Sequence, residues 1–146
     1  DRAEVQFRGP EGRLATVARW SAVRRLVTPA DVEADRALRL SRVRDPAARQ
    51  RIEDSWMQQP APPETMPAFG QLLLDPQGNV WAEHYAPPAE PPTGQFDVLD
   101  PSGVWLGTVQ APPGLRALAV GNDWLLGAVR DGQGLETILV LPIDKV

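Results

Sequence analysis

A four-residue turn pattern, Asp-Pro-X-Gly, occurs twice between short apolar runs and constrains this chain more than any other feature. The copies are residues 75–78 (Asp-Pro-Gln-Gly) and 100–103 (Asp-Pro-Ser-Gly). Proline sets φ for the second position of a type I turn, aspartate accepts backbone N–H bonds, and the final glycine takes a positive φ. A type I turn followed by such a glycine is a common hairpin connection. Each copy therefore predicts a β-hairpin.

The runs beside these turns are short and rich in Leu, Val, Trp and Phe, which is typical of strands. A polar, Pro-rich loop at residues 86–93 joins the two hairpins. The expected strands lie near residues 72–75, 79–85, 95–100 and 104–109. Residues 69–110 are therefore predicted to form one antiparallel four-stranded sheet.

Weaker forms of the same pattern occur on both sides of this unit. Gly-Pro-Glu-Gly at residues 9–12 predicts a hairpin, half of such a unit, over residues 4–20. After the Ala-Pro-Pro-Gly turn at 111–114, Gly-Asn-Asp and Asp-Gly-Gln-Gly mark two more turns. They separate three expected strands, at residues 115–120, 124–129 and 135–141. Residues 114–143 thus predict an incomplete, three-stranded unit.

A helical hairpin is expected over residues 28–58, between the first and second β units. Thr28 is a favourable N-cap, Pro29 suits the first helical position, and Asp31 complements the helix dipole. This helix is expected to end near residue 44, and Asp45-Pro46 begins a second helix that ends near 58. The apolar positions form only a narrow stripe: Val32, Leu38, Leu40, Val43, Ile52, Trp56 and Met57. A Pro-rich, extended linker at residues 59–68 follows.

The charges are distributed unevenly along the chain. Residues 13–51 hold ten arginines and four acids, a net charge of +6, whereas residues 52–146 carry −9. Six arginines on the helical hairpin are candidates for docking onto an anionic surface, either an acidic protein patch or lipid headgroups: Arg36, Arg39, Arg42, Arg44, Arg49 and Arg51. The alternative is a solvated helical face in a protein that prefers arginine. Nucleic acid is not expected as a partner, because the net charge is −4 and no recognition motif is present.

Length and composition exclude several classes of protein. The 146 residues suit a single β-rich domain over residues 1–146. No apolar run approaches the ~20 residues of a transmembrane helix, and the first residues lack the regions of a signal peptide. Without cysteine there are no disulfides, thiolate metal sites or cysteine nucleophiles.

No constellation of catalytic or metal-binding residues stands out. His84 is the only histidine, and strand alternation places it opposite Glu83, so it is expected at the surface rather than as a general base. Pairs of acids such as Asp97 with Asp100, or Glu83 with Asp97, could face each other as in a glycosidase, but only by chance in so acidic a segment. No catalytic residue, metal or cofactor is therefore predicted.

Two other residue classes receive a structural interpretation. Asp75, Asp100 and Asp131 each offer a single carboxylate, which suits a turn cap better than a Ca²⁺ loop. Five tryptophans are expected to anchor the core rather than to form a sugar-stacking platform: Trp20, Trp56, Trp81, Trp105 and Trp124.

The paired hairpins at residues 69–81 and 96–109 resemble a blade of bacterial six-bladed β-propellers of the NHL-like type, as C-terminal blades or as a truncated relative. The segment 115–131 and the final Ile138-Leu-Val-Leu-Pro-Ile resemble a last blade, and the insert beginning Val27-Thr28-Pro29 also fits. The resemblance implies a mainly β fold of about nine strands in propeller-type blades. A closed ring needs on the order of 24 strands, so this would be a partial propeller with open edges.

The leading hypothesis is a non-catalytic structural module, an extrinsic subunit that braces a larger, membrane-associated protein complex. A bacterial photosynthetic reaction-centre assembly is one such setting, although no residue selects it. The alternatives are a ligand- or sugar-binding propeller and a propeller hydrolase or lactonase. Because related propellers are often secreted or lipid-anchored, an extracytoplasmic (periplasmic or secreted) location peripheral to a membrane is expected, and a cytoplasmic one stays open.

Overall fold

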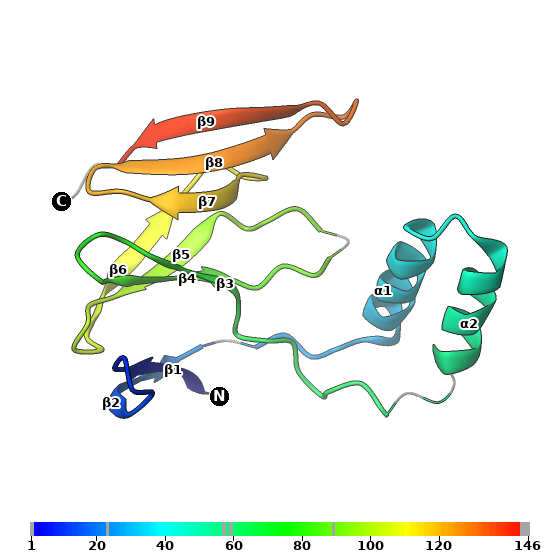
Figure 1. The fold of residues 1–146 in the computed structure, drawn as a ribbon, viewed down its shortest axis with the longest axis horizontal. Coiled ribbons are helices and arrows are strands. Elements are labelled where there is room, and N and C mark those ends of the chain that lie inside the picture. Colours follow the sequence, from blue (N-terminus) through cyan, green and yellow to red (C-terminus); the bar gives the residue numbers. More distant parts are fainter. Residues whose placement is uncertain (1, 23, 57, 59, 89, 144–146) are drawn as a thin grey trace. The chain divides into compact units, whose positions relative to one another are not determined.

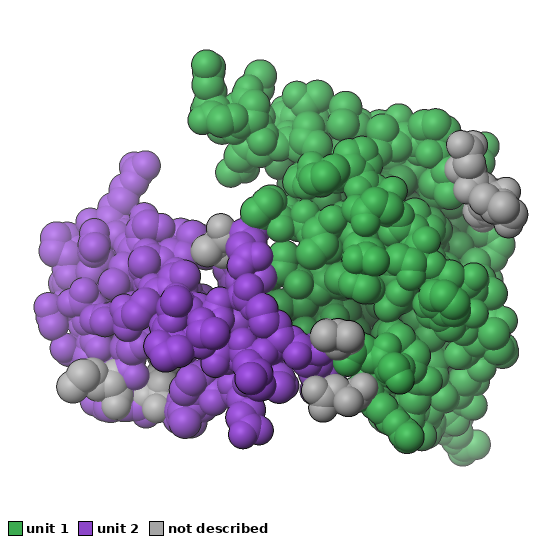
Figure 2. Space-filling view, turned by 180° about the vertical axis from the view of Figure 1, so that it is seen from behind, with its two compact units in different colours: residues 1–23, 67–86, 91–146 green, residues 24–66, 87–90 purple. Residues whose placement is uncertain are grey.

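The computed structural model describes residues 2–22, 24–56, 58, 60–88 and 90–143. The chain divides into two compact units (Figure 2). Unit 1 comprises residues 1–23, 67–86 and 91–146, and unit 2 comprises residues 24–66 and 87–90. The helical hairpin therefore belongs to a unit separate from the strands.

The described residues of unit 1 form nine antiparallel strands in three sheets, as the turn pattern predicted (Figure 1). Sheet 1 contains β1 (Arg2–Arg8) and β2 (Leu14–Ser21). Sheet 2 contains, in order, β3 (Phe69–Leu74), β4 (Val80–His84), β5 (Gln95–Leu99) and β6 (Trp105–Gln110). Sheet 3 contains β7 (Arg116–Val120), β8 (Trp124–Arg130) and β9 (Glu136–Pro142).

Four hairpin turns share one geometry. Their last residues, Gly12, Gly78, Gly103 and Gly134, have φ between 73° and 86°. In each turn this glycine donates its N–H to the carbonyl of the first turn residue at 2.8–3.0 Å. A side chain other than glycine would be strained at this φ, so the position of the glycine fixes where each strand pair closes.

Both faces of sheet 2 have a neighbouring sheet, although its edge strands β3 and β6 keep Leu74 and Trp105 68% and 53% exposed. One face packs against sheet 3, and the core between them includes the completely buried Phe96 and Leu115 together with Trp81. The other face of sheet 2 meets sheet 1, where the Trp20 ring stacks on Phe69 at a centroid distance of 6.0 Å.

The expectation that all five tryptophans anchor the core is wrong. Trp81 is 3% exposed, but Trp105 is 53% exposed and Trp124 is 39% exposed. Trp105 lies on an edge strand, and Trp124 lies at the start of β8, so neither is enclosed from both sides.

Unit 2 contains α1 (Pro29–Ser41) and α2 (Pro46–Trp56), which lie side by side (Figure 1). Helix α1 ends three residues before the predicted boundary. Its C-cap is Arg42, and the Asp45 carboxylate caps α2 through the N–H groups of Ala47 and Ala48 at 3.1 and 3.2 Å. Met57, which the sequence placed in the apolar stripe, lies outside the described residues.

Neither helix contains a buried residue among those described, and neither has the length and apolar character needed to cross a membrane. The linker expected at residues 59–68 is not simply extended, although its first residue lies outside the described part. Met66 donates its N–H to the Arg25 carbonyl at 2.8 Å, and Val27 donates to the Glu64 carbonyl at 3.0 Å. The two segments that leave and re-enter the hairpin are thus tied together.

Candidate functional site

The only histidine of the chain and a strand carboxylate meet on one face of sheet 2. The β4–β5 register pairs Ala82 with Asp97, and strand alternation puts His84 on the same face as Ala82. His84 Nε2 lies 3.1 Å from Asp97 Oδ2. The His84 side chain is 38% exposed, as a rim position predicts, but its pairing with a carboxylate was not foreseen.

Asp97 is the centre of a hydrogen-bond network. Trp20 Nε1 donates to Oδ2 at 3.0 Å, while Thr108 Oγ1 and Trp105 Nε1 donate to Oδ1 at 2.9 and 3.4 Å. Together with His84, two donors approach each carboxylate oxygen. Burial alone would raise the pKa of Asp97, but the bonds from Thr108, Trp20 and His84 outweigh it and hold the pKa below its ordinary value. Asp97 is therefore an ionised, saturated acceptor that fixes the His84 ring.

A pocket of about 230 Å³ opens beside this pair. Residues 20–22 and 68–69 line it together with Ala82, His84 and Asp97, so all of its walls belong to unit 1. The pocket combines the stacked rings of Trp20 and Phe69 with one oriented imidazole. Such a mixture of aromatic walls and few polar groups is typical of small-molecule sites.

The acid pairs considered from the sequence do not form a catalytic pair. Glu83 pairs with Phe96 across the sheet and faces sheet 3, whereas Asp97 faces sheet 1. Asp100 accepts the N–H groups of Ser102 and Val104, both at 2.9 Å, and caps its turn. Glu83 is 8% exposed; burial raises its pKa despite a hydrogen bond from the Gly94 backbone, and its Oε1 has no partner among the described groups.

The turn aspartates accept hydrogen bonds from the backbone of their own turns. Asp75 Oδ1 accepts from the N–H groups of Gln77 and Asn79 at 3.0 and 2.9 Å, and Asp131 Oδ1 accepts from Gln133 and Leu135 at 2.9 Å each. Within the described ranges, no three or more His, Cys, Asp or Glu residues gather in a way that could hold a metal ion. These carboxylates therefore serve the turns, as predicted.

The six candidate docking arginines lie on both helices of unit 2 and between them. Three of them have acidic neighbours within the hairpin. Arg36 lies 3.6 Å from Glu33, Arg39 lies 2.9 Å from Asp35, and Arg51 lies 4.0 Å from Asp45. The Arg39 guanidinium also lies 5.4 Å from the centroid of the Trp56 ring. Of these contacts, only that of Arg39 with Trp56 joins the two helices; the ion pairs lie within α1 or between α2 and its cap.

Arg42, Arg44 and Arg49 are exposed, and none has an ion-pair partner in the part of the chain that the structure describes. Arg42 caps the C-terminus of α1, and Arg44 follows it in the connection between the helices. Arg49 lies near the start of α2. Three of the six arginines thus form ion pairs within the hairpin, and the other three are free, among the described residues, to contact another molecule.

The net charge of +6 of residues 13–51 is not carried by the whole helical hairpin. Residues 28–58 contain six arginines and six acids, so their net charge is zero. The excess is local: residues 39–51, the hairpin tip, hold five arginines and one acid. In α2 the arginines precede Glu53 and Asp54, an order that opposes the helix dipole. Arg39 and Arg42 suit the C-terminal end of α1, but helix stability does not explain the arginines at the start of α2.

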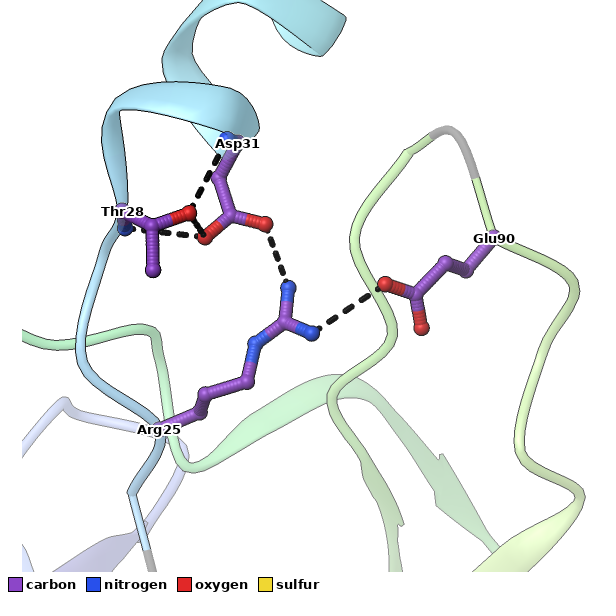
Figure 3. A network of polar contacts seen from close by, with 4 residues as sticks. All are labelled: Arg25, Thr28, Asp31 and Glu90. Carbon is purple, nitrogen blue, oxygen red and sulfur yellow. Dashed lines mark hydrogen bonds and ion pairs between the residues drawn. The ribbon is translucent and has the colours of Figure 1, made fainter.

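A polar network fixes the base of the hairpin (Figure 3). The Arg25 guanidinium lies between Asp31 and Glu90, with N–O distances of 2.6 and 3.2 Å. Thr28 is the N-cap, as expected, and it also forms a capping box with Asp31, which was not predicted from the sequence. The hydrogen bond from the Thr28 side chain is the main reason that the pKa of Asp31 is lowered. The loop at residues 87–90 is thereby joined to the start of α1 within unit 2.

Sequence reasoning missed the pocket because its residues come from four strands or strand ends. One signal was available: alternation from Trp81 places His84 on the same face as Ala82, and the predicted hairpin places Asp97 on the next strand. The contact of His84 with Asp97 required the register of those strands, which the intervening loop did not reveal.

Comparisons with known proteins identify no relative. No protein-family model matches the chain, and neither a curated protein nor a solved structure is significantly similar to it.

Proposed function

We propose that this chain is a non-catalytic interaction module, an extrinsic subunit of a larger protein assembly, with its sheets acting as blades of a partial propeller. The observation that carries this proposal is an uncovered apolar face on sheet 3. Leu139 and Leu141 of β9 pack against the core, while the alternate residues Ile138 and Val140 are 56% and 66% exposed. Monomers rarely leave such a face open.

This surface, the β9 face, also includes residues of β8. The register pairs Val140 with Leu126, and strand alternation puts Trp124 on the side of Leu126. Strand β9 is itself an edge, because among the described strands it pairs only with β8. Apolar side chains beside unpaired backbone groups suit a partner that contributes a β-sheet or an added strand.

The hairpin tip supplies a second contact to the same kind of partner. Guanidinium groups pair bidentately with carboxylates, and the tip exposes arginine without an exposed large apolar residue that could enter a bilayer. An acidic protein patch therefore fits the tip better than lipid headgroups. A bacterial, extracytoplasmic assembly at a membrane, such as a photosynthetic reaction centre, is the setting that we propose, on the basis of the propeller resemblance.

The decisive experiment is the native mass of the protein isolated from its source, measured by light scattering in mild detergent. We expect co-migration with a larger complex, partly released at high salt because salt screens the arginine contacts. A free particle of about 16.0 kDa at low salt would contradict the proposal.

Variants separate the two surfaces. The double variant Ile138→Thr/Val140→Thr keeps β-propensity but removes apolar area, and it should weaken association at every salt concentration. Arg42→Gln/Arg44→Gln/Arg49→Gln should weaken it at low salt only. Leu14→Thr is the matched control, since Leu14 is 53% exposed but lies on sheet 1.

A further inference from the structure

The pocket beside His84 has the size and shape of a site for one ring. Its hollow exists because small side chains, Ala22, Ala68 and Ala82, stand where larger ones would fill it. Its volume is about 230 Å³. A cavity of ~150 Å³ holds a benzene molecule in an engineered protein, so this pocket has room for a ring with one or two substituents.

Trp20 and Phe69 bring two aromatic rings to the pocket. The rings stack on each other, inclined by only 16°, and both line the pocket, so each presents an outer face or an edge to a ligand. Planar or chair-shaped rings pack well against aromatic side chains, which provide that contact with little loss of conformational entropy. The aromatic lining therefore favours a cyclic ligand over an extended chain.

Among the described residues, two side chains bring free polar atoms to the pocket, His84 and Ser21, and only the His84 ring is held in a fixed orientation by a carboxylate. His84 Nε2 lies 3.1 Å from Asp97 Oδ2, so the tautomer with its proton on Nε2 fits this contact and leaves Nδ1 as an acceptor. No hydrogen bond to Nδ1 occurs within the described part of the chain. Asp97 already accepts four hydrogen bonds and offers no further lone pair, while its negative charge disfavours an anion.

From these observations we infer that the pocket binds a neutral, single-ring compound whose hydroxyl group donates a hydrogen bond to His84 Nδ1. The ring lies against Trp20 and Phe69, and the alanines accommodate its edge. A phenol and a monosaccharide share this chemistry, and the experiment below distinguishes them. This site shares no residue with the β9 face or the hairpin tip, so ligand binding here can be tested separately from the proposed association.

The test follows the indole N–H resonance of Trp20 in the intact protein, assigned with Trp20→Phe, during titration with phenol, fluorobenzene or methyl glucoside. Fluorobenzene has nearly the shape of phenol but no O–H donor. We expect a saturable shift with phenol and about 2- to 12-fold weaker binding of fluorobenzene, which is the worth of one net hydrogen bond. A saturable shift with the glucoside alone would assign the site to sugars.

Two variants locate the effect. In Ala68→Leu, which fills the pocket, binding should be lost. In His84→Ala the preference for phenol over fluorobenzene should disappear, even if both still bind. The inference is overturned if neither phenol nor glucoside gives a saturable shift in the wild type. It is also overturned if folded Ala68→Leu still binds, or if the preference survives in His84→Ala.

Discussion

The Asp97 network makes a specific prediction about stability. In Asp97→Ala the four donors around the carboxylate lose their acceptor. Thr108 and Trp105 are exposed, and water can replace the carboxylate there. The Trp20 N–H is part-buried, and the His84 ring is only 38% exposed. At about 1–3 kcal/mol for each donor left unpaired, discounted for partial hydration, the free energy of unfolding should fall by about 2–4 kcal/mol.

Urea denaturation followed by tryptophan fluorescence measures this loss, with Asp123→Ala as the control. Asp123 is exposed, its side chain makes no hydrogen bond among the described groups, and its loss should change stability by less than about 0.5 kcal/mol. The difference between wild type and Asp97→Ala also depends on pH. Because the folded pKa of Asp97 is lowered, its stabilisation is present above the unfolded pKa and is lost as pH falls through the folded pKa.

The expected signature is thus a large difference at neutral pH that shrinks in acid. A difference below about 0.5 kcal/mol at neutral pH would show that water already satisfies the network. A large difference that stays constant from neutral pH to strong acid would show that packing, rather than the ionised carboxylate, is responsible. Either result would refute the account of Asp97 as a saturated, ionised acceptor.

Three further predictions address other parts of the chain. Because burial raises the pKa of Glu83, its ionisation destabilises the fold increasingly as pH rises from the unfolded pKa through the folded pKa; Glu83→Gln should remove this slope and stabilise the protein at neutral pH by about 1 kcal/mol in urea titrations. A Cβ at Gly127 would lie 2.7 Å from Leu115 Cδ1, so Gly127→Ala should cost about 1–3 kcal/mol, whereas Gly132→Ala, which meets no atom within 4 Å, should not; equal effects would contradict the packing argument. Thr28→Ala removes the capping box of a helix without buried residues and should reduce the helical circular dichroism signal, while Ser41→Ala should leave it unchanged.

Local turn chemistry explains why the strands could be predicted. Each Gly at the end of a four-residue turn specifies a positive φ, and the four hairpins close where that residue occurs. The boundary of α1 was less predictable, because the restriction that Pro46 places on Asp45 allows the helix to continue to residue 44, whereas α1 ends at Ser41 with Arg42 as its C-cap. The turn residues therefore predicted the order of the strands, whereas the end of α1 could not be predicted to within three residues.

Long-range features were not accessible in the same way. His84 and Asp97 are joined only through the β4–β5 register, and the pocket depends on how β2 and β3 begin and end around them. Trp105 and Trp124 are large aromatic residues of the kind that usually lie in a core, but their exposure depends on which parts of the sheets remain uncovered. The arginine cluster was visible in the sequence, yet only the structure separates Arg42, Arg44 and Arg49 from the internally paired arginines.

The sheet topology has a consequence for how the chain folds. Every strand in the described residues pairs only with its neighbours in the sequence, so the strands of each sheet follow one another along the chain. Hairpins of this kind form in about 1–10 μs, and low sequence separation of contacts favours fast folding. In the sequence, the helical segment falls after the strands of sheet 1 and before those of sheet 2, so it interrupts no hairpin. Docking of preformed sheets should therefore limit the folding rate. Doubling the length of the helical insert should add only about 0.6 kcal/mol to the entropic cost of bringing sheets 1 and 2 together.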